Sequence, residues 1–329
     1  MKHTNTNTNT PLHLHHIHHL PTLIWHFTES NFPTFVLPNS FFGFLGALSG
    51  PALTTSPTTP NLSTLLPRLP LIILFNWALV FIFDLSNQRL PESIHEDHLN
   101  KPWRPLPTNR ITADQTRRLL LATIPIILGV TYILGVWQET CPILILTWMY
   151  NDLKGGDELI RDGIIAVAYG LYNIASLKIA CIEEAGPSEQ GYLWTIVISG
   201  VILTTMQIQD LKDVAGDRTC GRQTVPLAFG EWWSRWSIAG FVVGWSVICM
   251  WFWGLEGWAW YVVVGGVGGL VVGRVLMGRA VEGDAAAWRL WSVWLMVLYG
   301  LPCLGGDGVE GFGVGDLLDG VEGYWASML

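Results

Sequence analysis

Long apolar segments separated by polar connections constrain this chain more than any other feature of its sequence. A helix needs about 20 apolar residues to cross the ~30 Å hydrocarbon core of a bilayer. Half of the 329 residues are hydrophobic and only 13% are charged, against ~25% in a typical soluble domain. The sequence therefore predicts an all-α integral membrane bundle of about nine transmembrane helices. The nine expected spans are Phe32–Leu53, Leu69–Leu85, Leu119–Trp137, Cys141–Tyr150, Gly163–Cys181, Tyr192–Gln209, Ser237–Gly254, Trp258–Met277 and Ala287–Leu304.

The basic residues predict how these spans are oriented. Most of the 18 lysines and arginines lie in the N-terminal tail or in the connections after spans two, four, six and eight. The connections after spans three, five and seven have none; Arg68 and Lys178 depart from the pattern. Because positive charge concentrates on the cytosolic side of membrane proteins, we expect a cytosolic N-terminus. In a eukaryotic cell the membrane would be that of the endoplasmic reticulum.

Composition also divides the chain and excludes some functions. Residues 1–30, with a Thr-Asn repeat and a cluster of histidines, are expected to be a disordered cytosolic tail, although the histidines could alternatively bind a metal. Residues 31–304 would form the nine-helix transmembrane domain, and residues 305–329 an acidic, glycine-rich tail. With 26 acidic against 18 basic residues, no nucleic-acid partner is expected. The five cysteines form no C-x-x-C pair, so neither a zinc site nor a disulfide framework is predicted. The sequence indicates no protein partner.

The first of two acidic connections follows the second span. Asp84, Asn87 and Gln88 have the spacing i, i+3, i+4, so they share one face at the end of a helix. Three further acids follow: Glu92, Glu96 and Asp97.

The second acidic connection follows the sixth span, on the same predicted side of the membrane. Asp210, Asp213 and Asp217 are spaced i, i+3, i+7 and are expected on one helical face. Clustered carboxylates repel one another unless a cation neutralises them, and oxygen ligands of this kind suit Mg²⁺ completed by substrate phosphates.

Basic residues interleaved with these acids suit phosphate oxygens. They are Lys101, Arg104, Lys154, Lys212 and Arg218. Together the two connections predict a diphosphate bridged by metal and facing a lipidic pocket. The alternative is that both are solvated loops whose charge only sets the topology. That alternative explains the lysines and arginines but not the repeated carboxylates on one face.

These motifs resemble those of the UbiA superfamily of membrane prenyltransferases, which have nine helices and two Asp-rich motifs after helices two and six. The second connection matches that family's second motif, and Tyr150 and Lys154 occupy the place of its Y-x-x-x-K motif. The first motif departs from the usual N-D-x-x-D-x-x-x-D, because Gln88 follows Asn87. This variant is similar to a fungal subgroup that includes sesquiterpene cyclases.

The resemblance implies Mg²⁺-dependent ionisation of an allylic prenyl diphosphate, with farnesyl diphosphate favoured. It assigns three groups of residues. The metal ligands would be Asp84, Glu92, Glu96, Asp97, Asp210, Asp213 and Asp217; the catalytic residues Lys154, Tyr150, Arg104 and Arg218; and the substrate-binding residues Asn87, Lys101, Lys212 and Tyr172.

What captures the resulting cation decides the activity. Attack by the substrate's own double bonds makes the enzyme a terpene cyclase, which the subgroup resemblance favours. Attack by an aromatic or lipid acceptor makes it a prenyltransferase. A transporter is a distant alternative, because it would need ionisable residues at mid-membrane positions of facing helices. Such residues are nearly absent here, and Lys178 is the main case.

Overall fold

The structure is a computed structural model that describes residues 20–182, 184–255, 257–278 and 280–305. The expected C-terminal tail after Gly305 and most of the expected N-terminal tail, including its histidine cluster, lie outside these residues. The longer helices are α1 (Leu20–Thr28), α2 (Leu37–Leu48), α4 (Leu69–Gln88), α5 (Pro91–Asn100), α6 (Ala113–Ile133), α7 (Trp137–Asn151), α8 (Arg161–Ala180), α9 (Glu189–Thr205), α12 (Glu231–Phe252), α13 (Trp258–Met277) and α14 (Val281–Tyr299). The short ones are η2 (Phe32–Val36), η3 (Gly50–Ala52), α3 (Leu62–Leu65), η4 (Leu66–Arg68), η5 (Gly155–Asp157), η6 (Met206–Lys212), α10 (Val214–Thr219), α11 (Val225–Phe229) and η7 (Leu301–Cys303).

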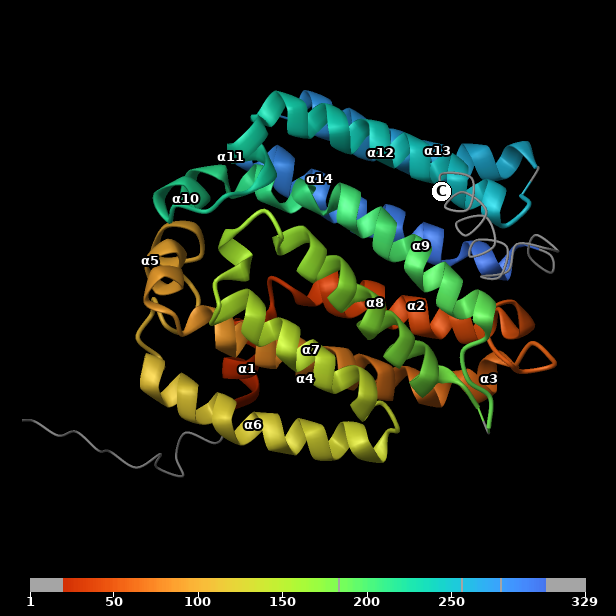
Figure 1. The fold of residues 1–329 in the computed structure, drawn as a ribbon, viewed down its shortest axis with the longest axis horizontal. Coiled ribbons are helices and arrows are strands. Elements are labelled where there is room, and N and C mark those ends of the chain that lie inside the picture. Colours follow the sequence, from red (N-terminus) through yellow and green to blue (C-terminus); the bar gives the residue numbers. More distant parts are fainter. Residues whose placement is uncertain (1–19, 183, 256, 279, 306–329) are drawn as a thin grey trace, which may run out of the picture.

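The long helices run side by side as a bundle (Figure 1), and the described residues contain no strand. Each of the nine expected spans coincides with a helix, which confirms the all-α membrane fold. Within the described part of the chain, six stretches are long and apolar enough to cross a membrane, so the number nine stays a prediction. They are Leu62–Gln88, Ala113–Ile133, Arg161–Ala180, Glu189–Lys212, Glu231–Phe252 and Trp258–Met277.

Small and polar side chains hold the centre of this bundle together. A Cβ on Gly43 of α2 would lie 2.5 Å from the backbone of Ser176 in α8, so only glycine permits this approach. The Asn76 side chain of α4 donates to Ser176 at 2.9 Å and to Ser40 of α2 at 3.1 Å. In a membrane such buried polar groups must find partners within the protein, and these bonds fix α2, α4 and α8 to one another.

The expectation that residues up to 30 are disordered is wrong for the described part of that segment. Residues 20–28 form α1, with Phe27 only 1% exposed. The Phe27 carbonyl accepts from the Gln88 side chain at 2.8 Å, and the Thr28 hydroxyl accepts from the Trp77 indole at 2.9 Å. Burial against α4 stabilises a helix too short to persist alone.

The expectation that three aspartates lie on one continuous helix after the sixth span is also wrong. The α-helix α9 ends at Thr205, and the chain continues as the 3₁₀ segment η6 before α10 begins at Val214. Gln207 in η6 accepts from Ser234 at 2.7 Å and donates to Ser237 at 3.0 Å, both in α12. These two hydrogen bonds to α12 stabilise the 3₁₀ geometry of η6 and thereby determine where Asp210 lies.

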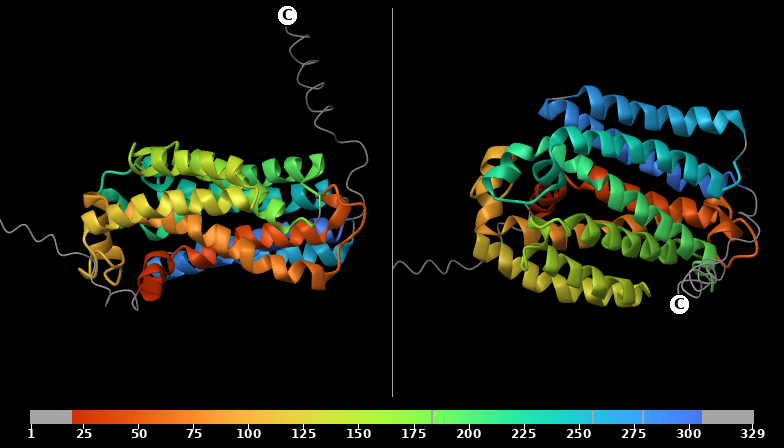
Figure 2. Two further views of the ribbon diagram at one scale, coloured as in Figure 1. Left: turned by 90° about the horizontal axis from the view of Figure 1, so that it is seen from below. Right: turned by 45° about the horizontal axis from the view of Figure 1, so that its top comes forward.

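Short helices gather at one end of the bundle. Figures 1 and 2 show α5 (orange), α10 and α11 (teal) at this end, where α5 and α10 lie next to each other. Both acidic connections therefore meet at the same end of the long helices, as their positions in the sequence predict.

Candidate active site

The two acidic connections are in direct contact. A Cβ on Gly216 of α10 would lie 2.3 Å from the Asn100 side chain of α5, so the two short helices touch where Gly216 has no side chain. Arg222 crosses the same junction, with 2.8 Å to Glu96 of α5 and 2.9 Å to Asp217 of α10. Residues far apart in the sequence thus form one charged site.

Asp84 is the most deeply placed acid of the first connection. It lies near the end of α4, is 1% exposed, and accepts from Asn31 at 2.7 Å and from Gln88 at 3.3 Å. Both bonds reach its Oδ1, while its buried Oδ2 has no partner. Its neighbour Asn87 donates to Asn151 of α7 at 3.0 Å, which joins two helices at this end of the bundle.

Asp97 and Arg104 form a buried pair within the first connection. Arg104 Nη1 lies 2.8 Å and 3.0 Å from the two oxygens of Asp97, and both side chains are 5% exposed. Both carboxylate oxygens are therefore engaged in this pair. This pairing fixes the position of the Arg104 guanidinium within the site.

The second connection places its three aspartates in different environments. Asp210 in η6 is 2% exposed and pairs with Arg161, at the start of α8, at 2.9 Å. Asp213 pairs with the neighbouring Lys212. Asp217 is 1% exposed and pairs with Arg222. The buried Oδ2 atoms of Asp210 and Asp217 have no hydrogen-bond partner among the described residues.

Positive charge also converges on the junction. Repulsion by Arg104, together with burial, lowers the pKa of Lys101 to about 8, and Lys212 acts in the same direction. Asp213 opposes this effect on Lys101. The lysines also keep the pKa of Asp213 below its usual value, since their attraction outweighs its burial. A cluster of cations under mutual repulsion is suited to a multivalent anion.

Some predicted site residues lie at the edge of this cluster. Lys154 pairs with Glu92 at 3.2 Å, and the two side chains are 60% and 58% exposed. Arg218 is exposed. Tyr150 is half-buried, and its ring packs 5.3 Å from that of Phe83. The structure therefore does not bring Glu92, Lys154 and Arg218 together with the buried acids. The Tyr150 hydroxyl, in contrast, lies within electrostatic reach of Asp210 and of its partner Arg161.

Tyr172 lies deeper, on the face of α8 that turns into the bundle. It is 3% exposed, and its ring centroid lies 5.6 Å from Phe35 and 6.2 Å from Phe75. Phe35 also contacts Tyr169, one turn earlier on α8, at 4.2 Å. Aromatic rings thus surround the apolar interior below the charged end.

Sequence reasoning missed several partners of the acids. Arg222, Arg161 and Asp157 each take part in the ion pairs of the site. A signal for Arg222 was available, since a glycine after a short helix commonly reverses the chain. No comparable signal marks Arg161, because its pairing with Asp210 depends on the tertiary fold.

The donor set fits a metal that phosphate oxygens complete. Among the described residues, no three His, Cys, Asp or Glu side chains are grouped so as to hold an ion by themselves. The partner-free oxygens of Asp84, Asp210 and Asp217 are nevertheless buried carboxylate acceptors. Mg²⁺ commonly takes one or two protein carboxylates and completes its shell with substrate phosphates and water.

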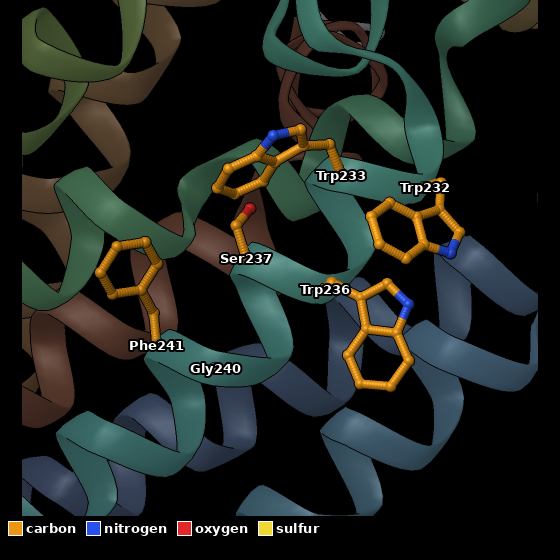
Figure 3. A pocket seen from close by; sticks show the side chains of 6 residues that line it. All are labelled: Trp232, Trp233, Trp236, Ser237, Gly240 and Phe241. Atoms are coloured by element: carbon orange, nitrogen blue, oxygen red, sulfur yellow. The ribbon is translucent and has the colours of Figure 1, made fainter.

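A pocket of about 470 Å³ on the outside of α12 is a different feature. It is lined by Trp232, Trp233, Trp236, Ser237, Gly240 and Phe241. Figure 3 shows the Trp233 ring extended over Ser237, and Trp232 beside Trp236. Since no charged side chain lines it, it does not suit a diphosphate, and exposed tryptophans are typical of a membrane interface.

Comparison with known proteins gives consistent results. Polyprenyl transferase eriF of Hericium erinaceus is 29% identical over 217 residues, 66% of this chain and 71% of that protein. Diterpene cyclase eriG of the same organism is 29% identical over 171 residues, 50% of this chain and 53% of that protein. The structure of a UbiA homologue from Archaeoglobus fulgidus bound to GPP and Mg²⁺ matches with a TM-score of 0.56 at 14% identity, over 86% of this chain and 99% of that one. The sequence profile of the UbiA prenyltransferase family matches residues 43–299, and the chain therefore belongs to this family.

Proposed function

We propose that the chain is a membrane-bound terpene cyclase that ionises farnesyl diphosphate with the help of Mg²⁺. Family membership makes it an enzyme that acts on a prenyl diphosphate, either as a cyclase or as a prenyltransferase. The observation that carries the proposal is the meeting of buried carboxylates and cations from both acidic connections at one end of an apolar bundle.

The buried acids would hold the metal and the cations would bind the diphosphate. Asp84, Asp210 and Asp217 each offer a free carboxylate oxygen. When bound, Mg²⁺ supplies electrostatic stabilisation of the charge that develops on the leaving diphosphate. Lys101 and Arg104 lie in the same cluster and would add fixed positive charge, which is commonly the largest catalytic contribution.

The remaining proposed ligands and contacts come from residues around this centre. Glu96, Asp97 and Asp213 would support the metal sites, and Lys212 and Asn87 would contact the diphosphate. Tyr150 is half-buried near Arg161 and Asp210 and would act from its present place. The proposed ligand Glu92 and the cations Lys154 and Arg218 lie further out, so they would have to move towards the substrate when it binds. Their exposure leaves them free to do so.

The prenyl chain would lie in the apolar interior below the charged end. Ionisation breaks the allylic C–O bond, and the electron pair leaves with the diphosphate oxygen. A double bond of the same chain then attacks the allyl cation and forms a ring. Loss of a proton from the carbon next to the final cation yields a cyclic hydrocarbon, diphosphate and a proton. Buried rings such as Tyr172 and Phe35 exclude water and attract the cation, by ~2 kcal/mol when desolvated.

The competing proposal is a prenyltransferase, in which an aromatic or lipid acceptor captures the cation. Similarity to polyprenyl transferase eriF supports it at the same identity as similarity to diterpene cyclase eriG supports the cyclase. The variant first motif, with Gln88 after Asn87, favours the cyclase.

One incubation separates the two. Membranes containing the enzyme are given Mg²⁺ and farnesyl diphosphate without an acceptor, and the organic extract is analysed by gas chromatography and mass spectrometry. A cyclic sesquiterpene hydrocarbon is expected. If only farnesol or unchanged substrate is found until an acceptor is added, the cyclase proposal fails and the prenyltransferase replaces it.

The distribution of basic residues leads to a proposed membrane topology for this enzyme. The N-terminus and both acidic connections would face the cytosol, where prenyl diphosphates are available as water-soluble anions. In a eukaryotic cell the membrane would be that of the endoplasmic reticulum.

A further inference from the structure

Arg222 contacts more acids than any of the cations predicted for the site. Its Nη2 lies 2.8 Å from Glu96, its Nη1 2.9 Å from Asp217, and its Nε 3.1 Å from Asp157. These acids belong to α5, α10 and η5, three segments separated widely in the sequence. One guanidinium therefore joins both acidic connections to the loop that follows α7.

Local sequence explains how Arg222 reaches this position. Gly221 has a left-handed backbone, with φ of 70°. The Arg222 amide donates to the Asp217 carbonyl at 3.0 Å, and the Gly221 amide donates to the Arg218 carbonyl at 3.3 Å. This pair of bonds around a left-handed glycine is the Schellman motif that ends many helices. The reversal brings the Arg222 side chain back over Asp217, one turn of chain earlier.

The charges around Arg222 are not balanced by Arg222 alone. Three carboxylates share one guanidinium, and the Asp217 and Glu96 side chains are only 1% and 11% exposed. Asp217 Oδ2 is buried and has no partner. Buried charges are stable only when they are paired. Three carboxylates around one guanidinium leave the cluster with a net negative charge, which a further cation would neutralise.

We propose that Arg222 holds the three acidic segments together before metal binds and then competes with Mg²⁺ for Asp217 and Glu96, so that it sets the metal requirement of the enzyme. The inference rests on the proposed function only for its metal–diphosphate chemistry, and not for the fate of the prenyl chain. Arg222 is on this view a positioning residue, because it acts on the reaction through the acids that it holds.

Two substitutions shift this competition in opposite directions. Arg222→Gln removes the competing charge, so the Mg²⁺ concentration for half-maximal activity is expected to fall by about fivefold to tenfold, the scale of the net contribution of one ordinary hydrogen bond. Asp157→Asn removes one of the three carboxylates and leaves Arg222 more tightly held by the other two. The half-maximal Mg²⁺ concentration should then rise by about twofold to threefold.

A second measurement does not depend on turnover. Thermal unfolding of the detergent-solubilised protein is followed without metal, with Mg²⁺, and with Mg²⁺ plus inorganic diphosphate. Without metal, Arg222→Gln should unfold at a lower temperature than the unsubstituted protein, since its acids have lost their cation. Added Mg²⁺ should raise its unfolding temperature by more than it raises that of the unsubstituted protein.

Controls separate this role from ordinary structural support. Arg222→Lys keeps the charge but not the three-way geometry, so its Mg²⁺ requirement should stay close to that of the unsubstituted protein while its metal-free stability falls. Arg118→Gln removes an exposed arginine of α6 that, among the described residues, forms its ion pair with Asp114, and both measurements should be unchanged.

An unchanged or higher Mg²⁺ requirement in Arg222→Gln, with an ordinary Mg²⁺-induced stabilisation, overturns the proposal. If Arg222→Gln does not fold, Asp157→Asn decides, and an unchanged or lower Mg²⁺ requirement contradicts the competition. The thermal measurements use inorganic diphosphate, so they stand even if the protein makes no cyclic product. Failure of this inference and failure of the cyclase proposal are therefore distinguishable.

Discussion

Arg161 and Asp210 form a salt bridge of 2.9 Å that joins the first residue of α8 to the 3₁₀ segment η6, with the two side chains 10% and 2% exposed. This salt bridge holds Asp210 against α8, the helix that carries Tyr169 and Tyr172. The charged end and the aromatic interior are therefore connected through one buried contact.

Breaking this salt bridge on one side should cost more than removing it altogether. Arg161→Met leaves Asp210 buried and unpaired, so the free energy of unfolding should fall by about 3–5 kcal/mol. The double substitution Arg161→Met with Asp210→Leu should regain most of that stability but remain inactive, because the acid is lost. Denaturant unfolding in micelles and product formation measure the two effects. Equal instability of both variants would show that the two side chains do not act as a pair.

Removing divalent cations should abolish turnover. Under the proposed function the buried acids bind an anionic diphosphate only through an intervening cation, so excess chelator should stop product formation and added Mg²⁺ should restore it. Asp217→Ala should have nearly the same effect as the chelator, because Asp217 offers a buried free oxygen. Product is quantified by mass spectrometry. Full activity in excess chelator would rule out the metal bridge.

The pH dependence of substrate capture should report Lys101. Repulsion by Arg104 and burial bring its pKa down to about 8, so Lys101 is charged below this pH and becomes neutral as pH rises through it. Because kcat/KM reports the free enzyme, it should decline above pH 8 as a cation that binds diphosphate is lost. Lys101→Arg keeps its charge and should move the decline to higher pH. The same decline in both proteins would assign it to another group.

The elements that could be predicted from the sequence are those set by local composition. Each expected span contains a helix, because the length and hydropathy of a segment suffice to place it in a membrane. The change from α9 to η6 could not be predicted, since it depends on Gln207 bonding to Ser234 and Ser237 of another helix. The clustering of acids at one end was predictable from the alternation of spans. Their individual partners, such as Arg104 for Asp97, were not.

Two native cysteines provide a test of the topology. Cys220 follows α10 at the acidic end, and Cys303 lies in η7, after the last long helix. In sealed vesicles a membrane-impermeant maleimide should label Cys220 only from the cytosolic face and Cys303 only from the opposite face. Burial and the nearby Glu96 raise the pKa of Cys220, so labelling needs mildly alkaline buffer. Single-cysteine variants serve as controls, and labelling of both from one face would contradict the predicted number of spans.

Aromatic residues in the interior should control the product and not the ionisation. Tyr172→Leu is expected to change the ratio of cyclic products with little loss of substrate consumption, because the Tyr172 ring contacts Phe35 and Phe75 in the interior. Tyr132→Leu is the matched control, since Tyr132 is 70% exposed. Chromatography of the products measures both. An unchanged product ratio in Tyr172→Leu would show that this ring does not line the reaction chamber.

The arginine partners of the buried acids have a consequence for how the enzyme is made in the cell. Asp97, Asp210 and Asp217 each have a guanidinium partner from the chain itself. Under the proposed function, the newly synthesised protein would therefore complete membrane insertion and close its acidic end before it meets any metal or substrate. Insertion and metal loading would be separate events, and the purified protein should keep its fold in chelator and regain activity when the cation is added.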